Sequence, residues 1–311
     1  MSFKSYNVQS TKAGNFKKYL NSISFQSRYT SGLLFMGISA TAFGSAPTFA
    51  KLAFDNSINP SSLQSYRFLI TFIVILFVAI ITKTKLKVTR SHLPRLFTLA
   101  LSTGLSSFCY MTSVNYIPVA IASLTFFTFP LVVAPISHLL GMDKLSPLKV
   151  AAMLIAFSGL CLLMGNSYQL NWHGIAMAFA AGLFVATSFI VSKPLTNDLS
   201  PITLAVFATG MPCIAYLTIS FTFTTLVIPY TLAGCSGLIV NSLCHALGLT
   251  CCYAAIARLG ALRTAVMMNI EPLISALAAY LVLNQFLTIY QILGVCGVVF
   301  GIAVMSSTKK S

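Results

Sequence analysis

The chain has 311 residues, of which 57% are hydrophobic and 7% are charged, whereas soluble domains have roughly 25% charged residues. A mean hydropathy of +0.88 excludes a water-soluble globular protein, because so much apolar surface cannot be buried inside one globule. The net charge of +15 does not predict a nucleic-acid partner, because the basic residues are dispersed over separate loops. We therefore expect an all-α integral membrane protein surrounded by the lipid bilayer.

Hydrophobic segments predict ten membrane-spanning helices, each close to the roughly 20 residues that cross the hydrocarbon. Residues 1–30 precede the first helix, lack acids and are rich in Ser and Lys. This composition fits a cytoplasmic tail, and it also occurs in organellar transit peptides. The expected helices are 32–54, 62–82, 96–115, 118–140, 147–165, 173–192, 201–222, 231–256, 263–283 and 289–306.

The positions of the basic residues predict the orientation of these helices. Apart from Lys51 and Arg67, they gather in loops and tails on one side, which is the positive-inside pattern. We therefore expect a multi-pass protein of the cell (inner, cytoplasmic) membrane with cytoplasmic N- and C-termini. Bases on this side include Lys4, Lys12, Lys17, Lys18, Arg28, Lys83, Lys85, Lys87, Arg90, Arg95, Lys144, Lys149, Lys193, Arg258, Arg263, Lys309 and Lys310.

The sequence repeats itself at an offset of 142 residues. This shift superimposes FPL at 129–131 on EPL at 271–273, and Gly159 on Gly301. Each copy contains five expected spans, so the second copy enters the membrane upside down, as in many secondary transporters. We predict two inverted five-helix repeats between two cytoplasmic tails: 1–30 (tail), 31–165 (first repeat), 166–306 (second repeat) and 307–311 (tail).

One acid lies near the middle of an expected span, at Glu271. An ionised side chain at the bilayer centre costs on the order of 3 kcal/mol, and burial favours the neutral form of a carboxyl group. Glu271 is therefore a candidate for binding a proton or a cationic substrate group when the cavity fills with water. The alternative is that it caps backbone groups freed by the adjacent Pro272.

Pro130 and Pro272 occupy equivalent places in the two repeats. Neither proline can donate to the carbonyl four residues earlier, at Phe126 and Met268, so each loosens its helix. In lipid, a freed carbonyl must face protein or a watery cavity, which favours a central pathway between these helices. We predict hinges at both prolines, and the alternative is a pair of static kinks.

The repeats differ most beside these prolines. Phe126, Phe127 and Phe129 in the first repeat align with Met268, Asn269 and Glu271 in the second. An aromatic wall facing a polar, acidic wall suits an amphipathic or zwitterionic metabolite. Aromatic residues of membrane helices also serve simply to pack against neighbours or lipid.

Other polar residues are candidates for the same cavity. Asn241 and His245 share a helix face at i and i+4 spacing, and Tyr110 lies on the third expected span. Polar side chains in membrane helices also act as hydrogen bonds between helices, which remains the alternative for each. Arg67 is expected to extend to the outer interface, and its alternative role is an anion anchor near the external mouth.

A glycine pattern predicts close helix packing in the last span. Gly294, Gly297 and Gly301 fall on one face, and Gly297 with Gly301 forms a G-x-x-x-G pair. The repeat offset places Gly159 at the position equivalent to Gly301. We expect these residues to pack helices together, within the molecule or across a homodimer.

An enzymatic alternative rests on the G-x-S-G string at 234–237, which also occurs in intramembrane serine proteases. The nearest histidine in sequence, His245, lies nine residues from Ser236, roughly 13 Å along the helix and half a turn around it. It is too far to activate that serine. The chain has no G-x-x-x-x-G-K-S/T loop and no H-E-x-x-H motif, so we expect no nucleotide, metal or other cofactor and no enzyme activity.

The ends of both repeats resemble the EamA family of the drug/metabolite transporter superfamily. The similar stretches are 116–131, which begins YIPVA and ends FPL, and 269–273, which reads NIEPL; they continue to Gly159 and Gly301. The hydropathy pattern extends the resemblance over nearly the whole chain after residue 30. Members of that family are ten-helix carriers made of two inverted five-helix halves.

The resemblance implies export or exchange of small metabolites, such as amino acids, through a cavity between the halves. The family often has a glutamate where each half turns from its fourth to its fifth helix. Here those positions hold Asp143 and Gln285, so no role is transferred to an acid there.

Together these patterns predict a secondary transporter of a small amphipathic metabolite, working by alternating access. Glu271 would bind substrate or proton, the phenylalanines at 126–129 would hold the apolar part, and the two prolines would permit rocking. The alternatives are a membrane-embedded enzyme and a non-transporting membrane scaffold subunit.

Overall fold

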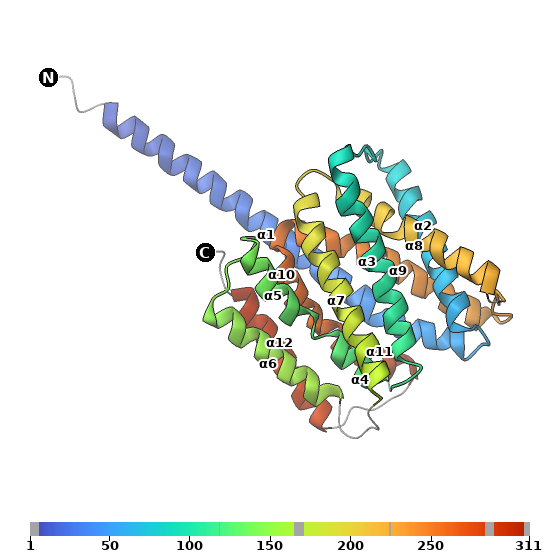
Figure 1. Cartoon of the computed structure of the whole chain (residues 1–311). Coiled ribbons are helices and arrows are strands. Elements are labelled where there is room, and N and C mark those ends of the chain that lie inside the picture. The colour runs from blue at the N-terminus through green and yellow to red at the C-terminus, as the bar shows by residue number, and fades with distance from the viewer. Residues whose placement is uncertain (1–5, 118, 165–170, 224, 284–288, 308–311) are drawn as a thin grey trace.

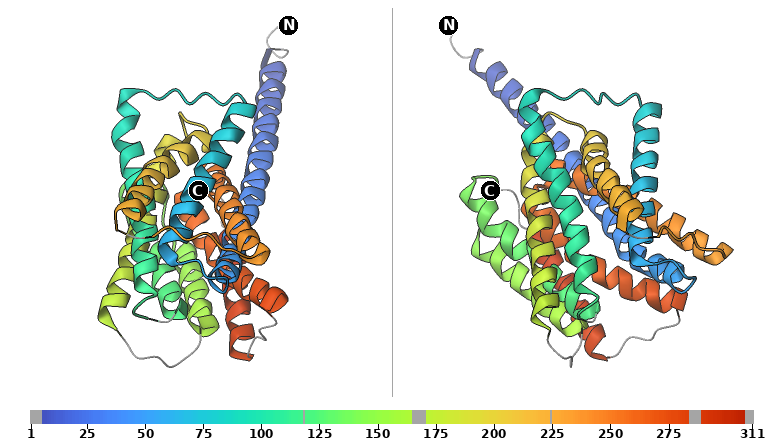
Figure 2. Two further views of the ribbon diagram at one scale, coloured as in Figure 1. Left: turned by 90° about the vertical axis from the view of Figure 1, so that its right-hand side faces the viewer. Right: turned by 45° about the vertical axis from the view of Figure 1, so that its right-hand side comes forward.

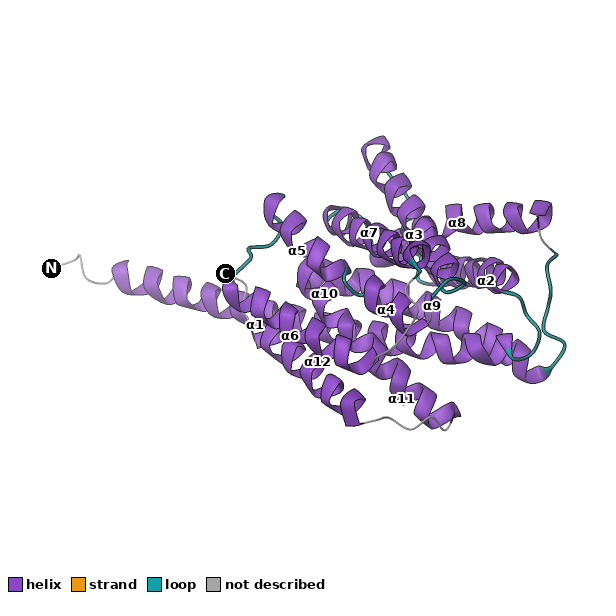
Figure 3. Ribbon diagram, turned by 60° about the horizontal axis from the view of Figure 1, so that its bottom comes forward, coloured by secondary structure: helices purple, strands orange, loops and turns teal. Residues whose placement is uncertain are grey.

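The fold is entirely helical in the part of the chain that the structure describes. This computed structural model describes residues 6–117, 119–164, 171–223, 225–283 and 289–307. The helices form one bundle, from which the N-terminal end of α1 projects (Figure 1; Figure 3). In chain order, with η for a 3₁₀ helix, they are α1 (Tyr6–Phe54), α2 (Pro60–Ile81), η1 (Arg90–His92), α3 (Leu93–Ser113), α4 (Val119–Phe126), α5 (Phe129–Leu139), α6 (Pro147–Met164), α7 (Trp172–Leu195), α8 (Pro201–Phe223), α9 (Leu232–Leu259), α10 (Ala261–Met267), η2 (Met268–Ile270), α11 (Glu271–Leu283) and α12 (Ile289–Ser307).

Six segments among the described residues are long and apolar enough to cross a membrane, which confirms an all-α multi-pass membrane protein. The expected total of ten spans stays a prediction, because other helices are shorter, more polar or interrupted. For example, the helix expected over 263–283 is divided by η2. The six segments are Gln26–Phe54, Pro60–Ile81, Ile121–Leu139, Trp172–Leu195, Pro201–Phe223 and Leu232–Leu259.

The contacts between helices follow the internal repeat. At the repeat offset, α1, α2, α3 and α6 correspond to α7, α8, α9 and α12. The packing of α1 on α9 has its counterpart in the packing of α7 on α3, and α2 on α9 in α8 on α3. The pairs α2 with α8 and α6 with α12 each join equivalent helices. Helices of one repeat therefore pack mainly against helices of the other, in a pattern that is unchanged when the repeats are exchanged.

The glycine face of α12 is covered by α6 of the same chain (Figure 1). A Cβ atom built on Gly159 would lie 2.5 Å from the backbone nitrogen of Val298 and 2.7 Å from the carbonyl oxygen of Gly294. A Cβ on Gly297 would lie 3.0 Å from Cα of Gly159, and one on Gly301 would lie 2.6 Å from the backbone nitrogen of Ala156. Only hydrogen side chains allow the two backbones to approach this closely.

Both repeats contain a helix break immediately before their FPL or EPL string. The break between α4 and α5 precedes Pro130, and the break between α10 and α11, filled by η2, precedes Pro272. Each proline stands in the first turn of the following helix, where its missing N–H has no helical acceptor to satisfy. Both breaks therefore have a local cause, the proline that follows each of them, and the sequence alone indicates it.

Gly260 joins α9 to α10 with φ 95° and ψ 164°, a region that is essentially restricted to glycine. We expect Gly260→Ala to lower the free energy of unfolding by about 1–3 kcal/mol, the typical cost of such strain. The new methyl would also lie 3.3 Å from each carboxylate oxygen of Asp143. Thermal unfolding of the purified protein measures the effect, and Gly37→Ala, where a Cβ meets nothing within 4 Å, is the control. Equal melting temperatures for the two variants would contradict the prediction.

Candidate functional site

The aromatic residues around the first helix break form one cluster. The ring of Phe126 lies 5.2 Å from that of Phe127 and 5.8 Å from that of Phe129, measured between centroids. Phe129 also lies 5.3 Å from Phe189 of α7, a residue that sequence reasoning missed because nothing in its local pattern marks it. Phe127 and Phe129 are buried, whereas Phe126 is only half-buried. Phe126 is thus the most exposed of these three phenylalanines.

Tyr110 of α3 extends this aromatic cluster toward the second repeat. Its ring stands edge-on to Phe126 at 5.3 Å, and its hydroxyl is hydrogen-bonded to the hydroxyl of Ser123 at 2.7 Å. The Tyr110 hydroxyl also lies within electrostatic range of Glu271. The expected aromatic wall and the expected acid, which come from different repeats, are therefore neighbours in space.

Glu271 is the first residue of α11 and is half-buried. Its backbone carbonyl lies against α1, where a Cβ on Gly44 would come within 2.7 Å of that oxygen. The two ion pairs found among the described residues, Lys51 with Asp55 and His92 with Asp198, do not involve it. The role of its carboxylate in binding a cation or a proton stays a prediction.

Asn269 lies in η2, two residues before Glu271, and its side chain is only 1% exposed. Its Oδ1 atom has no hydrogen-bond partner. A buried amide oxygen without a donor costs about 1–3 kcal/mol, so its place beside the helix break suits a bound water or ligand donor.

Asn241 and His245 contact different neighbouring helices. Asn241 donates from Nδ2 to the carbonyl of Ala46 on α1 at 2.8 Å, which ties α9 to α1. His245 is hydrogen-bonded through Nδ1 to Thr71 of α2 at 3.2 Å. Its ring also lies 5.3 Å from that of Phe68. The spacing of Asn241 and His245 predicts their shared helix face, but it does not predict which residues of α1 and α2 they contact.

The side chain of Arg67 points in a different direction from the one predicted. We expected it to extend to the outer interface, but its Nη2 donates to the hydroxyl of Ser107 on α3 at 2.7 Å. The same hydroxyl accepts from Gln64 Nε2, one turn earlier on α2. The sequence signal for this group is the spacing of Gln64, Arg67 and Thr71, which places three polar residues on one face of an apolar helix.

The enzymatic alternative gains no support from the geometry around Ser236. Its hydroxyl donates to the carbonyl of Ala233 in its own helix at 2.8 Å. His245 is instead bonded to Thr71, as described above. Across the described residues, no group of three His, Cys, Asp or Glu side chains is placed to hold a metal ion.

An apolar groove of about 620 Å³ runs along α1 and α9, away from the candidate residues. Leu34 and Leu247, which line it, are 63% and 52% exposed. It is a feature of the outer surface of the bundle, and none of the candidate substrate residues named above lines it.

A family model describes both repeats. The model of the EamA-like transporter family matches residues 30–165 and again residues 172–307, two segments that begin at the offset of the internal repeat. The chain belongs to the EamA-like transporter family. The family resemblance drawn from the sequence is thereby confirmed, and with it a membrane-embedded protein of a transporter family, built from two EamA repeats.

The fold is also found among solved structures. One, described only as the crystal structure of a protein, matches with a TM-score of 0.78 and 17% sequence identity, covering 89% of this chain and 98% of its own. At this identity the match shows the fold alone. A search of curated proteins gives no match.

Proposed function

We propose that this EamA-family protein is a secondary transporter that moves a small amphipathic metabolite by alternating access. The observation that carries the proposal is the position of Tyr110, whose ring contacts Phe126 of one repeat and whose hydroxyl lies within electrostatic range of Glu271 of the other. An apolar surface beside an available acid suits a solute with an apolar body and a cationic or protonated group.

The proposed movement uses the two helix breaks. Residues flanking Pro130 and Pro272 lack continuous helical hydrogen bonding, so a small change of φ and ψ there would tilt α5 and α11. Two five-helix halves of inverted orientation, together ten spans, would rock about these points and expose the cavity to each side in turn. The packing of α1 with α9 and of α7 with α3, which are equivalent pairs in the two repeats, supports this arrangement.

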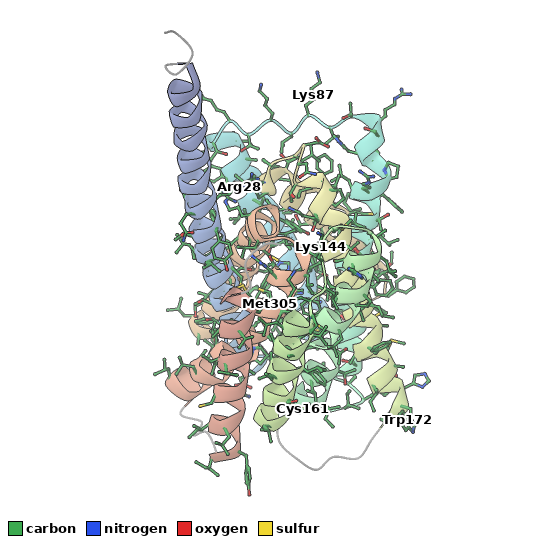
Figure 4. The ribbon with its side chains drawn as sticks, turned by 90° about the vertical axis from the view of Figure 1, so that its left-hand side faces the viewer. Arg28, Lys87, Lys144, Cys161, Trp172 and Met305 are labelled. Atoms are coloured by element: carbon green, nitrogen blue, oxygen red, sulfur yellow. The ribbon has the colours of Figure 1, made fainter. Side chains whose placement is uncertain are left out.

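The proposed orientation places both termini in the cytoplasm of a cell with an inner membrane. Arg28, Lys87 and Lys144 lie toward one end of the bundle, and Cys161 and Trp172 lie toward the other (Figure 4). The basic connection between α2 and α3 lies at the end where α1 begins (Figure 2). This distribution agrees with the positive-inside rule. Outward movement of the metabolite is part of the proposal.

Metabolite profiling of medium and cytoplasm tests the proposal. Cells expressing the protein are compared with cells carrying Ser236→Ala and with cells carrying an empty vector. We expect one compound to move from cytoplasm to medium, equally with the parent and with Ser236→Ala. A new compound whose total amount rises, and which disappears with Ser236→Ala, would instead indicate an enzyme.

Phe126→Ala is expected to weaken substrate binding without unfolding the protein. Loss of an aromatic contact costs about 0.5–1.5 kcal/mol, so KM should rise by about three- to tenfold while the maximal rate changes little. The measurement is concentration-dependent uptake of the profiled compound into proteoliposomes. Phe77→Ala, which removes a ring that is 60% exposed on α2, is the matched control and should leave KM unchanged. An unaltered KM in Phe126→Ala would count against the aromatic wall.

A further inference from the structure

Arg67 is a cation placed inside the bundle away from the protein's acids. The chain has four acidic residues, all in the described part. Asp55 pairs with Lys51 and Asp198 with His92, and the carboxylate of Asp143 accepts from the backbone N–H of Leu262. Glu271 lies within electrostatic range of Tyr110 and Cys252. No ion pair of Arg67 is found among the described residues, although buried charges are normally paired.

Arg67 and its neighbour Gln64 each have a buried polar atom without a hydrogen-bond partner. The Nε atom of Arg67 is buried and has no hydrogen-bond partner. The hydroxyl oxygen of Ser107 accepts from both Arg67 and Gln64, and Ser107 is also hydrogen-bonded to the side chain of Tyr216. Gln64 is 3% exposed, and its Oε1 atom is also unpartnered. Because the O and N atoms of an amide are assigned from the hydrogen-bond network, a rotated Gln64 would accept from the Ser107 hydroxyl and leave its own N–H groups as free donors.

We propose that Arg67, Ser107 and Gln64 form a binding site for the carboxylate of the transported solute. This inference rests on the proposed transport function and extends it by naming a chemical group of the substrate. A carboxylate is acceptor-only and matches the planar guanidinium with two parallel hydrogen bonds. A doubly charged phosphate fits less well, because Arg67 is the one cation described in this cluster, whose other members are Gln64, Ser107, Tyr216 and His245.

The proposed carboxylate site shares helices α3 and α9 with residues near the aromatic wall and Glu271. On α3, Ser107 lies one turn from Tyr110, about 5 Å along the helix. On α9, His245, which lies within electrostatic range of Arg67, is two turns from Cys252, about 10 Å along the helix. As part of the proposal, a solute bound at Arg67 directs its apolar body or cationic end along these helices, toward Phe126 and Glu271. The substrate class is a carboxylate-bearing amphipathic solute.

Protection of Arg67 against an arginine-specific reagent tests this proposal. The full-length protein in lipid nanodiscs is treated with phenylglyoxal, and modification of each arginine is followed by peptide mass spectrometry. The probes are acetate, 3-phenylpropionate, its neutral amide and inorganic phosphate. We expect 3-phenylpropionate to slow the modification of Arg67 by about tenfold, the effect of a charge-assisted hydrogen bond, and acetate to slow it less. The exposed Arg95 is an internal control and should react at one rate throughout.

Three results would overturn the carboxylate site. If Arg67 never reacts with phenylglyoxal, its guanidinium is not accessible from water. If 3-phenylpropionate and its neutral amide protect Arg67 equally, the site does not recognise the negative charge of the carboxylate. Protection by phosphate that equals or exceeds that by 3-phenylpropionate would assign the site to a different anion. Ser107→Ala should weaken the protection; unchanged protection would remove Ser107 from the site.

Glu271→Gln separates this inference from the transport proposal. The variant should retain carboxylate protection of Arg67 even if it no longer transports, because the guanidinium and its two partners remain. If the parent protein shows protection but no transport, the carboxylate site stands and the transport proposal fails. Loss of protection in Glu271→Gln would show that Arg67 does not bind the carboxylate independently.

Discussion

Replacing Glu271 with glutamine is expected to reduce transport by at least about thirtyfold. Glutamine keeps the size of the side chain but can neither carry the negative charge nor exchange a proton. Removing the proposed contact between Glu271 and a cationic group of the substrate costs about 2 kcal/mol or more, which corresponds to this factor. The measurement is the initial rate of exchange of the profiled compound in proteoliposomes that contain equal amounts of folded protein.

Asp55→Asn is the matched control for this change. It also replaces an acid with its amide, but Asp55 is 54% exposed and pairs with Lys51 four residues earlier on α1. Surface pairs of this kind contribute about 0–1 kcal/mol, so the control should transport at nearly the parent rate. If Glu271→Gln also transports at the parent rate, Glu271 has no part in the mechanism and serves to cap the backbone beside Pro272.

Sequence reasoning predicted the parts of the fold that depend on local chemistry. The breaks before Pro130 and Pro272 follow from the missing proline N–H, which acts within one turn of helix. The close packing of Gly159 and Gly301 follows from side-chain size and the repeat offset. The number of spans was harder to predict, because the break before Pro272 divides the helix expected over 263–283 into pieces shorter than a single span, whereas Ile121–Leu139 keeps membrane length across the break before Pro130.

The parts of the site that escaped prediction depend on contacts between distant segments. Phe189 joins the aromatic cluster only because α7 packs beside α5. The long side chain of Arg67 could have reached the interface. It instead donates to the hydroxyl of Ser107, which is 40 residues away in the sequence. Periodicity along one helix cannot indicate which neighbouring helix will receive a polar group.

Gly159→Leu is expected to prevent stable assembly of the two repeats. The first atom of any side chain there would overlap the backbone of α12, because the nearest backbone atoms lie 2.5, 2.7 and 2.8 Å from the Cβ position. Overpacking typically costs about 1–3 kcal/mol when side chains can adjust, and backbone atoms adjust less readily, so the loss should exceed about 3 kcal/mol. Fluorescence-detected size-exclusion chromatography after extraction measures the folded fraction, which should fall severely.

Gly37→Leu tests whether this loss arises from helix contact or from substitution of a membrane glycine as such. A Cβ on Gly37 meets nothing within 4 Å, and the residue lines the outer groove along α1 and α9. Leucine is a better helix former than glycine, so this variant should elute like the parent protein or unfold at a slightly higher temperature. A folded fraction for Gly159→Leu equal to that of Gly37→Leu would mean that α6 can separate from α12 without loss. The contact between these helices would then be a movable surface, and the rocking proposed at Pro130 and Pro272 would have to include it.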